Sequence, residues 1–127
     1  PDLFPSYQGG IVTASRARVE ANRQAVVGYL KGYLKGLDWT LAPQNRAAGA
    51  ELLLAKMPAI KPGVVDAVMD SLLSERTGLT PQGAVLPEGM RTVLDLRSRY
   101  GGGAQLRDIE TYLDLGCYHE ALAELAN

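Results

Sequence analysis

The sequence has very few of the side chains on which metal binding and nucleophilic catalysis depend. It contains one cysteine, Cys117, and one histidine, His119, so it can form neither an internal disulfide nor a zinc site built from spaced cysteine pairs. These two residues are two positions apart on an expected helix, where such side chains diverge. No Gly-x-Ser-x-Gly elbow surrounds any serine, and no acidic cluster suggests general acid–base catalysis. We therefore expect a protein that is not an enzyme and that uses no metal and no cofactor.

The charge balance and the hydropathy exclude further classes of partner. Thirteen basic and fourteen acidic residues leave a formal net charge of -1, so no overall field attracts nucleic acid or an anionic membrane surface. With 127 residues, 46% of them hydrophobic and 21% charged, the chain has the composition of one ordinary globular domain. We expect neither a disordered chain nor a membrane-spanning one.

The beginning of the chain carries no targeting signal. The sequence opens at Pro1, and no basic segment followed by an apolar stretch precedes the first expected element. A secretory signal needs that pattern. We expect that any targeting peptide has been removed or lies outside this sequence.

One short segment favours a β-strand. Tyr7-Gln8-Gly9-Gly10-Ile11-Val12-Thr13 joins two glycines to a β-favouring run, and we place a strand at about 8–14. No second run of comparable β character follows it. Because a strand needs a hydrogen-bonding partner, this segment is expected to pair with something outside the sequence or with another copy of the chain.

The rest of the sequence predicts helices separated by proline and glycine. A short helix is expected at 15–20, and Asn22 is expected to cap a long helix that ends near Leu41. Further helices are expected, in order, at 43–57, from Pro62, at 87–100 and within 106–127, with a loop at 77–86. Proline opens three of these helices, and the glycines at 101–103 end one of them. The predicted fold is mainly α.

The long helix carries glycines at a spacing of four. Gly28, Gly32 and Gly36 share one arc of the helical wheel with Ala25 and Trp39. Each glycine costs helix propensity, about 1 kcal/mol relative to alanine, so we expect another element to pack closely over this arc.

The order of short motifs along the chain is typical of one protein family. The motifs are Tyr7-Gln8-Gly9-Gly10, Glu20-Ala21-Asn22-Arg23, Leu37-Asp38-Trp39, Pro43-Gln44-Asn45-Arg46, Val93-Leu94-Asp95-Leu96-Arg97 with Tyr100-Gly101, and Tyr112-Leu113-Asp114-Leu115. In this order they resemble the later half of type 2 periplasmic solute-binding proteins. The resemblance is to the branch that serves ABC importers of nitrate, taurine, aliphatic sulfonates and thiamine-pyrimidine precursors. It extends over nearly the whole chain but only part of such a receptor.

The resemblance implies a fold and a function. Members of the family have two α/β lobes joined by crossing strands, and they close on a small solute. Residues 1–127 would be the C-terminal helical part of lobe 1, with the strand at 8–14 returning through the hinge. The resemblance further implies a periplasmic or extracytoplasmic protein that delivers its solute to an ABC permease, with the signal peptide outside this chain. Most of the pocket would lie in the missing N-terminal part.

Three residues are the expected solute contacts within this chain: Tyr7, Gln8 and Gly9. Glycine lets the backbone approach a ligand, and the tyrosine supplies a ring at the edge of the pocket and a hydroxyl. A hinge strand that only packs remains an equal alternative for them. Two positions depart from the family pattern, since Ala42 and Lys61 stand where relatives often have a capping acid and a capping serine.

Two other functions remain open. A free-standing helical protein-interaction module would also expose an unpaired strand. A thiamine-pyrimidine synthase shares the family fold, but its cysteine-rich motif is missing here. If the chain stands alone, its uncovered apolar faces predict a homodimer or a higher oligomer.

Overall fold

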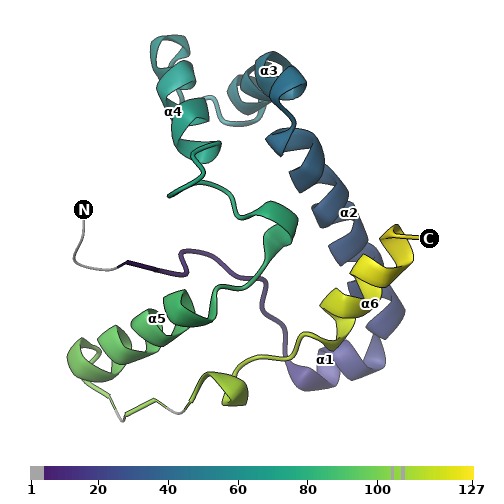
Figure 1. Cartoon of the computed structure of the whole chain (residues 1–127), viewed down its shortest axis with the longest axis vertical. Coiled ribbons are helices and arrows are strands. Elements are labelled where there is room, and N and C mark those ends of the chain that lie inside the picture. Colours follow the sequence, from purple (N-terminus) through teal and green to yellow (C-terminus); the bar gives the residue numbers. More distant parts are fainter. Residues whose placement is uncertain (1–4, 104, 107) are drawn as a thin grey trace. The chain divides into compact units, whose positions relative to one another are not determined.

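The computed structural model describes residues 5–103, 105–106 and 108–127, and helices dominate this part of the chain (Figure 1). Helix makes up 66% of the structure, which confirms a mainly α fold. The α-helices are α1 (Arg16–Ala21), α2 (Arg23–Leu41), α3 (Arg46–Lys56), α4 (Val65–Leu72), α5 (Pro87–Tyr100) and α6 (Gly116–Leu125). Short 3-10 turns are η1 (Pro43–Asn45), η2 (Pro62–Val64), η3 (Pro81–Gly83) and η4 (Ile109–Thr111).

None of the described residues forms a β-strand. The segment 8–14, where the sequence predicts a strand, runs between the N-terminal tail and α1 without regular secondary structure. The physical reason is the one that the sequence suggests, because a strand exists only through hydrogen bonds to a neighbouring strand. Its pairing with a chain outside this sequence stays a prediction.

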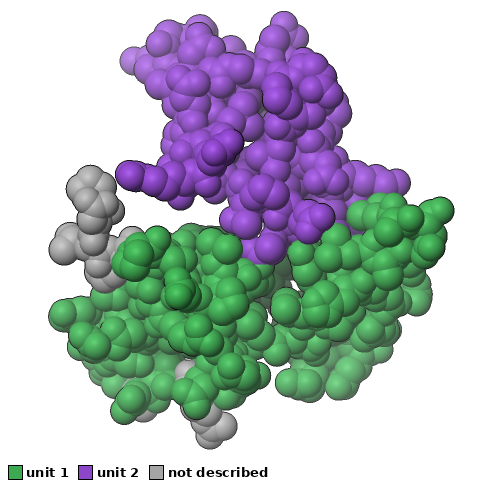
Figure 2. Space-filling view, viewed as in Figure 1, with its two compact units in different colours: residues 1–30, 85–127 green, residues 31–84 purple. Residues whose placement is uncertain are grey.

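The chain divides into two compact units (Figure 2). Unit 1 contains residues 1–30 and 85–127, and unit 2 contains residues 31–84. Helix α2 therefore contributes its first eight residues to unit 1 and the rest to unit 2. The buried side chains of unit 1 are those of Val27, Met90, Ile109, Cys117 and Ala121. Those of unit 2 are Leu34, Leu37 and Met69.

In unit 2, α3 packs against α4. The terminal methyl of Met69 lies 3.2 Å from the position that a Cβ on Gly49 would take, so the two helices touch at a glycine. Arg46 also joins them, because its Nη2 lies 2.9 Å from Oδ1 of Asp70 and donates a hydrogen bond to the carbonyl of Asp66 at 3.2 Å. The turn at Gly83, with φ of 59°, faces Tyr33, Leu34 and Leu37 of α2.

In unit 1, the start of α2 is tied to α6, and α5 is tied to the segment that follows it. Arg23 donates hydrogen bonds to Oε2 of Glu120 from Nε at 2.9 Å and from Nη2 at 2.6 Å. Helix α5 packs against η4. The hydroxyl of Ser98 accepts a hydrogen bond from the amide of Leu106 at 2.9 Å.

The boundary between α1 and α2 differs from the prediction in one respect. Ser15 caps α1, since its hydroxyl accepts a hydrogen bond from the amide of Arg18 at 3.3 Å. The side chain of Asn22, expected to cap α2, instead donates from Nδ2 to the carbonyl of Arg18 at 3.0 Å. Asn22 therefore closes the C-terminus of α1, because the free carbonyls there compete with the free amides of α2 for the same side chain.

Proline opens helices where the sequence predicts it, but in two cases through a 3-10 turn. Pro43 and Pro62 begin η1 and η2, and the α-helices follow three residues later. Ala42 and Lys61 stand at the N-cap positions of these turns and make no side-chain capping hydrogen bond. Pro87 opens α5 directly, and Gly101 ends it, as predicted.

The expectation that another element covers the glycines of α2 is not met among the described residues. A Cβ added at Gly28, Gly32 or Gly36 would meet no described atom within 4 Å, and all three glycines are exposed. The buried side chains of α2 lie on the opposite arc. The spacing correctly separated the two faces of the helix, but it could not show whether this chain supplies a cover for the second one.

Candidate functional site

The segment that carries the expected solute contacts lies in unit 1 as an extended stretch beside the start of α5. Residues 9–14 are all exposed, with Ile11 at 46% and Val12 at 54%. Among the described residues, no backbone hydrogen bond pairs 9–14 with another extended segment. This stretch thus presents backbone amides and carbonyls that pair with no other extended segment among the described residues, together with three β-branched side chains, those of Ile11, Val12 and Thr13.

The side chain of Gln8 fixes the beginning of this segment to α5. Its Oε1 accepts a hydrogen bond from the backbone amide of Leu86 at 2.8 Å, and its Nε2 donates to the carbonyl of Gly10 at 2.9 Å. Leu86 is the N-cap residue of α5. Both ends of the carboxamide are therefore used within the chain.

The backbone of the same segment crosses α5 at Gly89. A Cβ at Gly89 would lie 2.7 Å from the nitrogen of Gln8, 3.0 Å from the carbonyl carbon of Tyr7 and 3.1 Å from the hydroxyl of Ser6. Real Cβ atoms do not approach backbone this closely, so only glycine fits at this crossing. Gly89 and its neighbour Met90 are both buried, at the end of α5 that the segment crosses.

The structure thus brings Tyr7 and Gln8 to α5 and leaves Gly9 in open space. The side chain of Tyr7 is 56% exposed, so its phenol is accessible. A Cβ at Gly9 would meet nothing within 4 Å. Sequence reasoning selected these three residues but missed Leu86 and Gly89, which hold them. The available signal was a glycine in the first turn of a helix, where it weakens the helix unless something packs on it.

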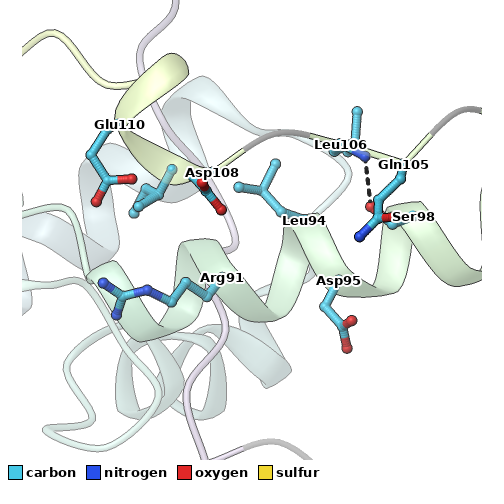
Figure 3. A pocket seen from close by; sticks show the side chains of 9 residues that line it. Arg91, Leu94, Asp95, Ser98, Gln105, Leu106, Asp108 and Glu110 are labelled. Carbon is cyan, nitrogen blue, oxygen red and sulfur yellow. Dashed lines mark hydrogen bonds between the residues drawn. The ribbon is translucent and has the colours of Figure 1, made fainter.

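A hollow lies elsewhere in unit 1, between α5 and the stretch that leads into η4 (Figure 3). Its lining residues are Arg91, Leu94, Asp95, Ser98, Gln105, Leu106, Asp108, Ile109 and Glu110. Figure 3 shows Leu94 directed toward the 108–110 turn and Asp95 directed away from it. The hollow has a volume of about 390 Å³.

Charged side chains of both signs line this hollow. Among the described residues, these are the carboxylates of Asp95, Asp108 and Glu110 and the guanidinium of Arg91. Asp95 is paired with Arg99, whose Nε lies 2.9 Å from its Oδ1. The balance of these charges assigns no ligand to the hollow.

The comparisons with known proteins name no relative for this chain. No family model, no curated protein and no solved structure matches it. The site must therefore be interpreted from its own geometry.

The cysteine and the histidine of the chain lie on different faces of one helix. Cys117 is buried while His119 is exposed on the same helix, α6, as the two-residue spacing predicts. Within the residues that the structure describes, no three His, Cys, Asp or Glu side chains gather as a metal site requires. In the same part of the chain, no helix is both long and apolar enough to cross a membrane.

A further surface feature is the glycine-bearing arc of α2, which no described residue covers. We call this the glycine face and define it by Gly28, Gly32, Gly36, Tyr29 and Trp39. The two aromatic side chains are 59% and 41% exposed, and the space above the glycines is empty. An exposed helix face with small residues and large aromatic rings is typical of a surface that packs against another element.

Proposed function

We propose that this chain is the C-terminal helical part of lobe 1 of a two-lobe solute-binding protein that serves an ABC importer. The observation that carries the proposal is the extended segment 9–14, which is exposed and has no pairing segment among the described residues. In a two-lobe receptor this segment is a hinge strand, and the sheet that pairs with it lies in the other part of the protein. The ordered motifs from Tyr7-Gln8-Gly9-Gly10 to Tyr112-Leu113-Asp114-Leu115 support the same assignment.

The glycine face of α2 gives independent support. Helices that cover a sheet need an apolar or small-residue surface on the sheet side. Here Tyr29 and Trp39 are exposed beside three glycines with open space above them. In the proposed receptor, the missing sheet of lobe 1 packs on this face.

The proposal assigns a role to each expected solute contact. Tyr7 offers an accessible phenol, and Gly9 offers backbone that no side chain shields. Gln8 holds both of them at the hinge through its bonds to Leu86 and Gly10. The solute is a small molecule such as nitrate, a sulfonate or a thiamine precursor, captured outside the cytoplasm and passed to the permease.

Solute binding by the complete reading frame tests this proposal. We expect the longer protein to bind one of nitrate, taurine, an alkanesulfonate or a thiamine-pyrimidine precursor in titration calorimetry. Residues 1–127 alone are expected to bind none of them, because most of the pocket lies elsewhere. A reading frame without an α/β lobe and a secretion signal upstream of Pro1 contradicts the proposal.

A second function is favoured by the same exposed surfaces. A free-standing helical module that binds another protein also needs an open helix face and an unpaired extended edge. The upstream sequence separates the two functions. A stop codon or an unrelated domain immediately before these residues supports the interaction module, whereas a lobe-like sequence supports the receptor.

A further inference from the structure

The extended segment touches α5 through two independent sets of contacts that lie within three residues of each other on the helix. The first is the hydrogen bond from the amide of Leu86 to Oε1 of Gln8, at 2.8 Å. The second is the close crossing of the Tyr7–Gln8 backbone over Gly89. The first contact depends on the side chain of Gln8, and the second depends on the lack of a side chain at Gly89. Both fix the same short stretch of chain, 78 positions away from Leu86 in the sequence.

The hydrogen bond satisfies an amide that the helix itself leaves free. Leu86 is the N-cap residue of α5 and precedes Pro87, which has no N–H. The amide of Leu86 has no partner within the helix, as is general for the first amides of a helix. No side chain within α5 caps this end, because Leu86 cannot accept a hydrogen bond. Gln8 supplies the acceptor from outside. The start of α5 and the extended segment therefore stabilise each other.

We propose that Ser6–Gln8 and the first turn of α5 form a clasp, in which Gln8 and Gly89 are positioning residues for the extended segment 9–14. The clasp holds the chain immediately before Gly9 and Gly10, where an added Cβ would meet no described atom within 4 Å. At its other end, the segment enters α1 through the Ser15 cap. Residues 9–14 are thus a strap that is tied at both ends, and among the described residues no backbone hydrogen bond pairs it with another extended segment. Release of the clasp frees one end of the strap while α1 stays folded.

The clasp explains why Gln8 is a carboxamide. A carboxylate could accept from Leu86 but could not donate to the carbonyl of Gly10, and an apolar side chain could do neither. The bond to Gly10 curls the side chain back on its own backbone, which orients Oε1 toward Leu86. The clasp consists of residues of unit 1 alone and does not depend on the proposed transport function.

Amide hydrogen exchange, followed residue by residue by NMR, tests the clasp. We expect Gln8→Leu to raise the exchange rate of the Leu86 amide on the order of tenfold, since this amide loses its acceptor. The amide of Leu79 is the reference, because it donates to the carbonyl of Leu72 within unit 2 at 2.8 Å. Its rate should not change. Gln24→Leu, on the exposed surface of α2, is the matched control and should leave the Leu86 rate unchanged.

A second pair of variants tests the backbone crossing without touching the hydrogen bond. Gly89→Ala should raise the Leu86 rate by a similar factor, because the new Cβ forces Tyr7 and Gln8 away from α5. Gly28→Ala, with open space above it, should not. An unchanged Leu86 rate in Gln8→Leu, or equal effects of the two alanine substitutions, overturns the clasp. An equal rise at Leu79 also overturns it, since this would indicate general unfolding.

Discussion

Arg23 and Glu120 form a two-pronged contact between the start of α2 and the middle of α6, with Nε and Nη2 of the guanidinium both directed at one carboxylate oxygen. The residues are 97 positions apart, so this contact links the two ends of unit 1. The hydrogen bond that Arg23 donates to Glu120 raises the pKa of Arg23 above the ordinary arginine value, and the charges of Glu120 and Asp114 add to the effect.

Replacement of this carboxylate is expected to have a small and salt-sensitive effect. Glu120→Gln keeps an acceptor but removes the charge, so it should lower the melting temperature slightly at low salt and less at high salt. The pair is open to solvent, with side-chain exposures of 51% and 28%. Thermal melts at two ionic strengths measure the difference, with Glu20→Gln, at an exposed position of α1 in the same unit, as the control. Equal losses at both ionic strengths would show that the contact acts through packing.

The contribution of the Arg23 guanidinium should not depend on pH in the ordinary working range. Because its pKa is raised in the folded state, its stabilising effect is fully present below the ordinary arginine pKa. The effect is lost only as the pH rises through the raised folded value. Melting temperatures of the native chain and of Arg23→Gln should therefore differ by a constant amount between about pH 6 and about pH 9. A difference that vanishes within this range contradicts this explanation.

Two glycines of unit 2 should respond oppositely to alanine. Gly32 lies in α2 with open space around it, so Gly32→Ala should raise the free energy of unfolding by about 1 kcal/mol through helix propensity. At Gly78, a Cβ would lie 2.4 Å from the carbonyl oxygen of Leu72 and 2.6 Å from that of Ser74. Gly78→Ala should therefore lower the free energy of unfolding by about 1–3 kcal/mol, because backbone must move. Urea titrations measure both changes, and changes of equal sign would contradict the packing at Gly78.

Met69 is the side chain whose removal should cost unit 2 most. It is 2% exposed and contacts α3 at Gly49. Met69→Ala should lower the free energy of unfolding by about 2–5 kcal/mol, because it leaves a cavity between α3 and α4. Met69→Leu preserves most of the volume and should cost less than about 1.5 kcal/mol. Equal losses of unfolding free energy in the two variants would contradict close packing of Met69 between α3 and α4.

The isolated chain is expected to associate with itself through the glycine face of α2. Exposed aromatic rings beside small residues favour burial against a second copy. Light scattering should report a dimer or a higher oligomer. Tyr29→Lys should shift this toward the monomer, whereas Tyr100→Lys, at a position 80% exposed on α5, should not. A clean monomer of the unmodified chain at high concentration contradicts this expectation.

Helix positions were predictable from the sequence because their signals are local. Pro87 and Gly101 mark both ends of α5 correctly, since one fixes a helical φ without needing a hydrogen bond and the other follows the last turn. The loop around Gly78 and Pro81 was equally clear. It was harder to predict which of two adjacent helix ends a polar side chain caps, as Asn22 shows. Its side chain could serve either helix, and the sequence alone does not say which free group is nearer.

Contacts between distant segments were not predictable in the same way. Nothing near Gln8 in the sequence indicates that its carboxamide will meet the amide of Leu86, or that Gly89 must lack a side chain. The glycines of α2 show the complementary problem. Their spacing predicted a shared face, but among the described residues no atom lies within 4 Å of a Cβ added at any of the three. A single sequence encodes the faces of its helices more clearly than it encodes what lies opposite them.

The burial of Cys117 provides a built-in reporter for unit 1. The thiol is 7% exposed on α6, one helical turn from the fully buried Ala121. A reagent in solution can therefore reach the sulfur only when α6 moves away from its neighbours. Because the sequence contains no other cysteine, the rate of alkylation measures this opening directly, with no engineered label.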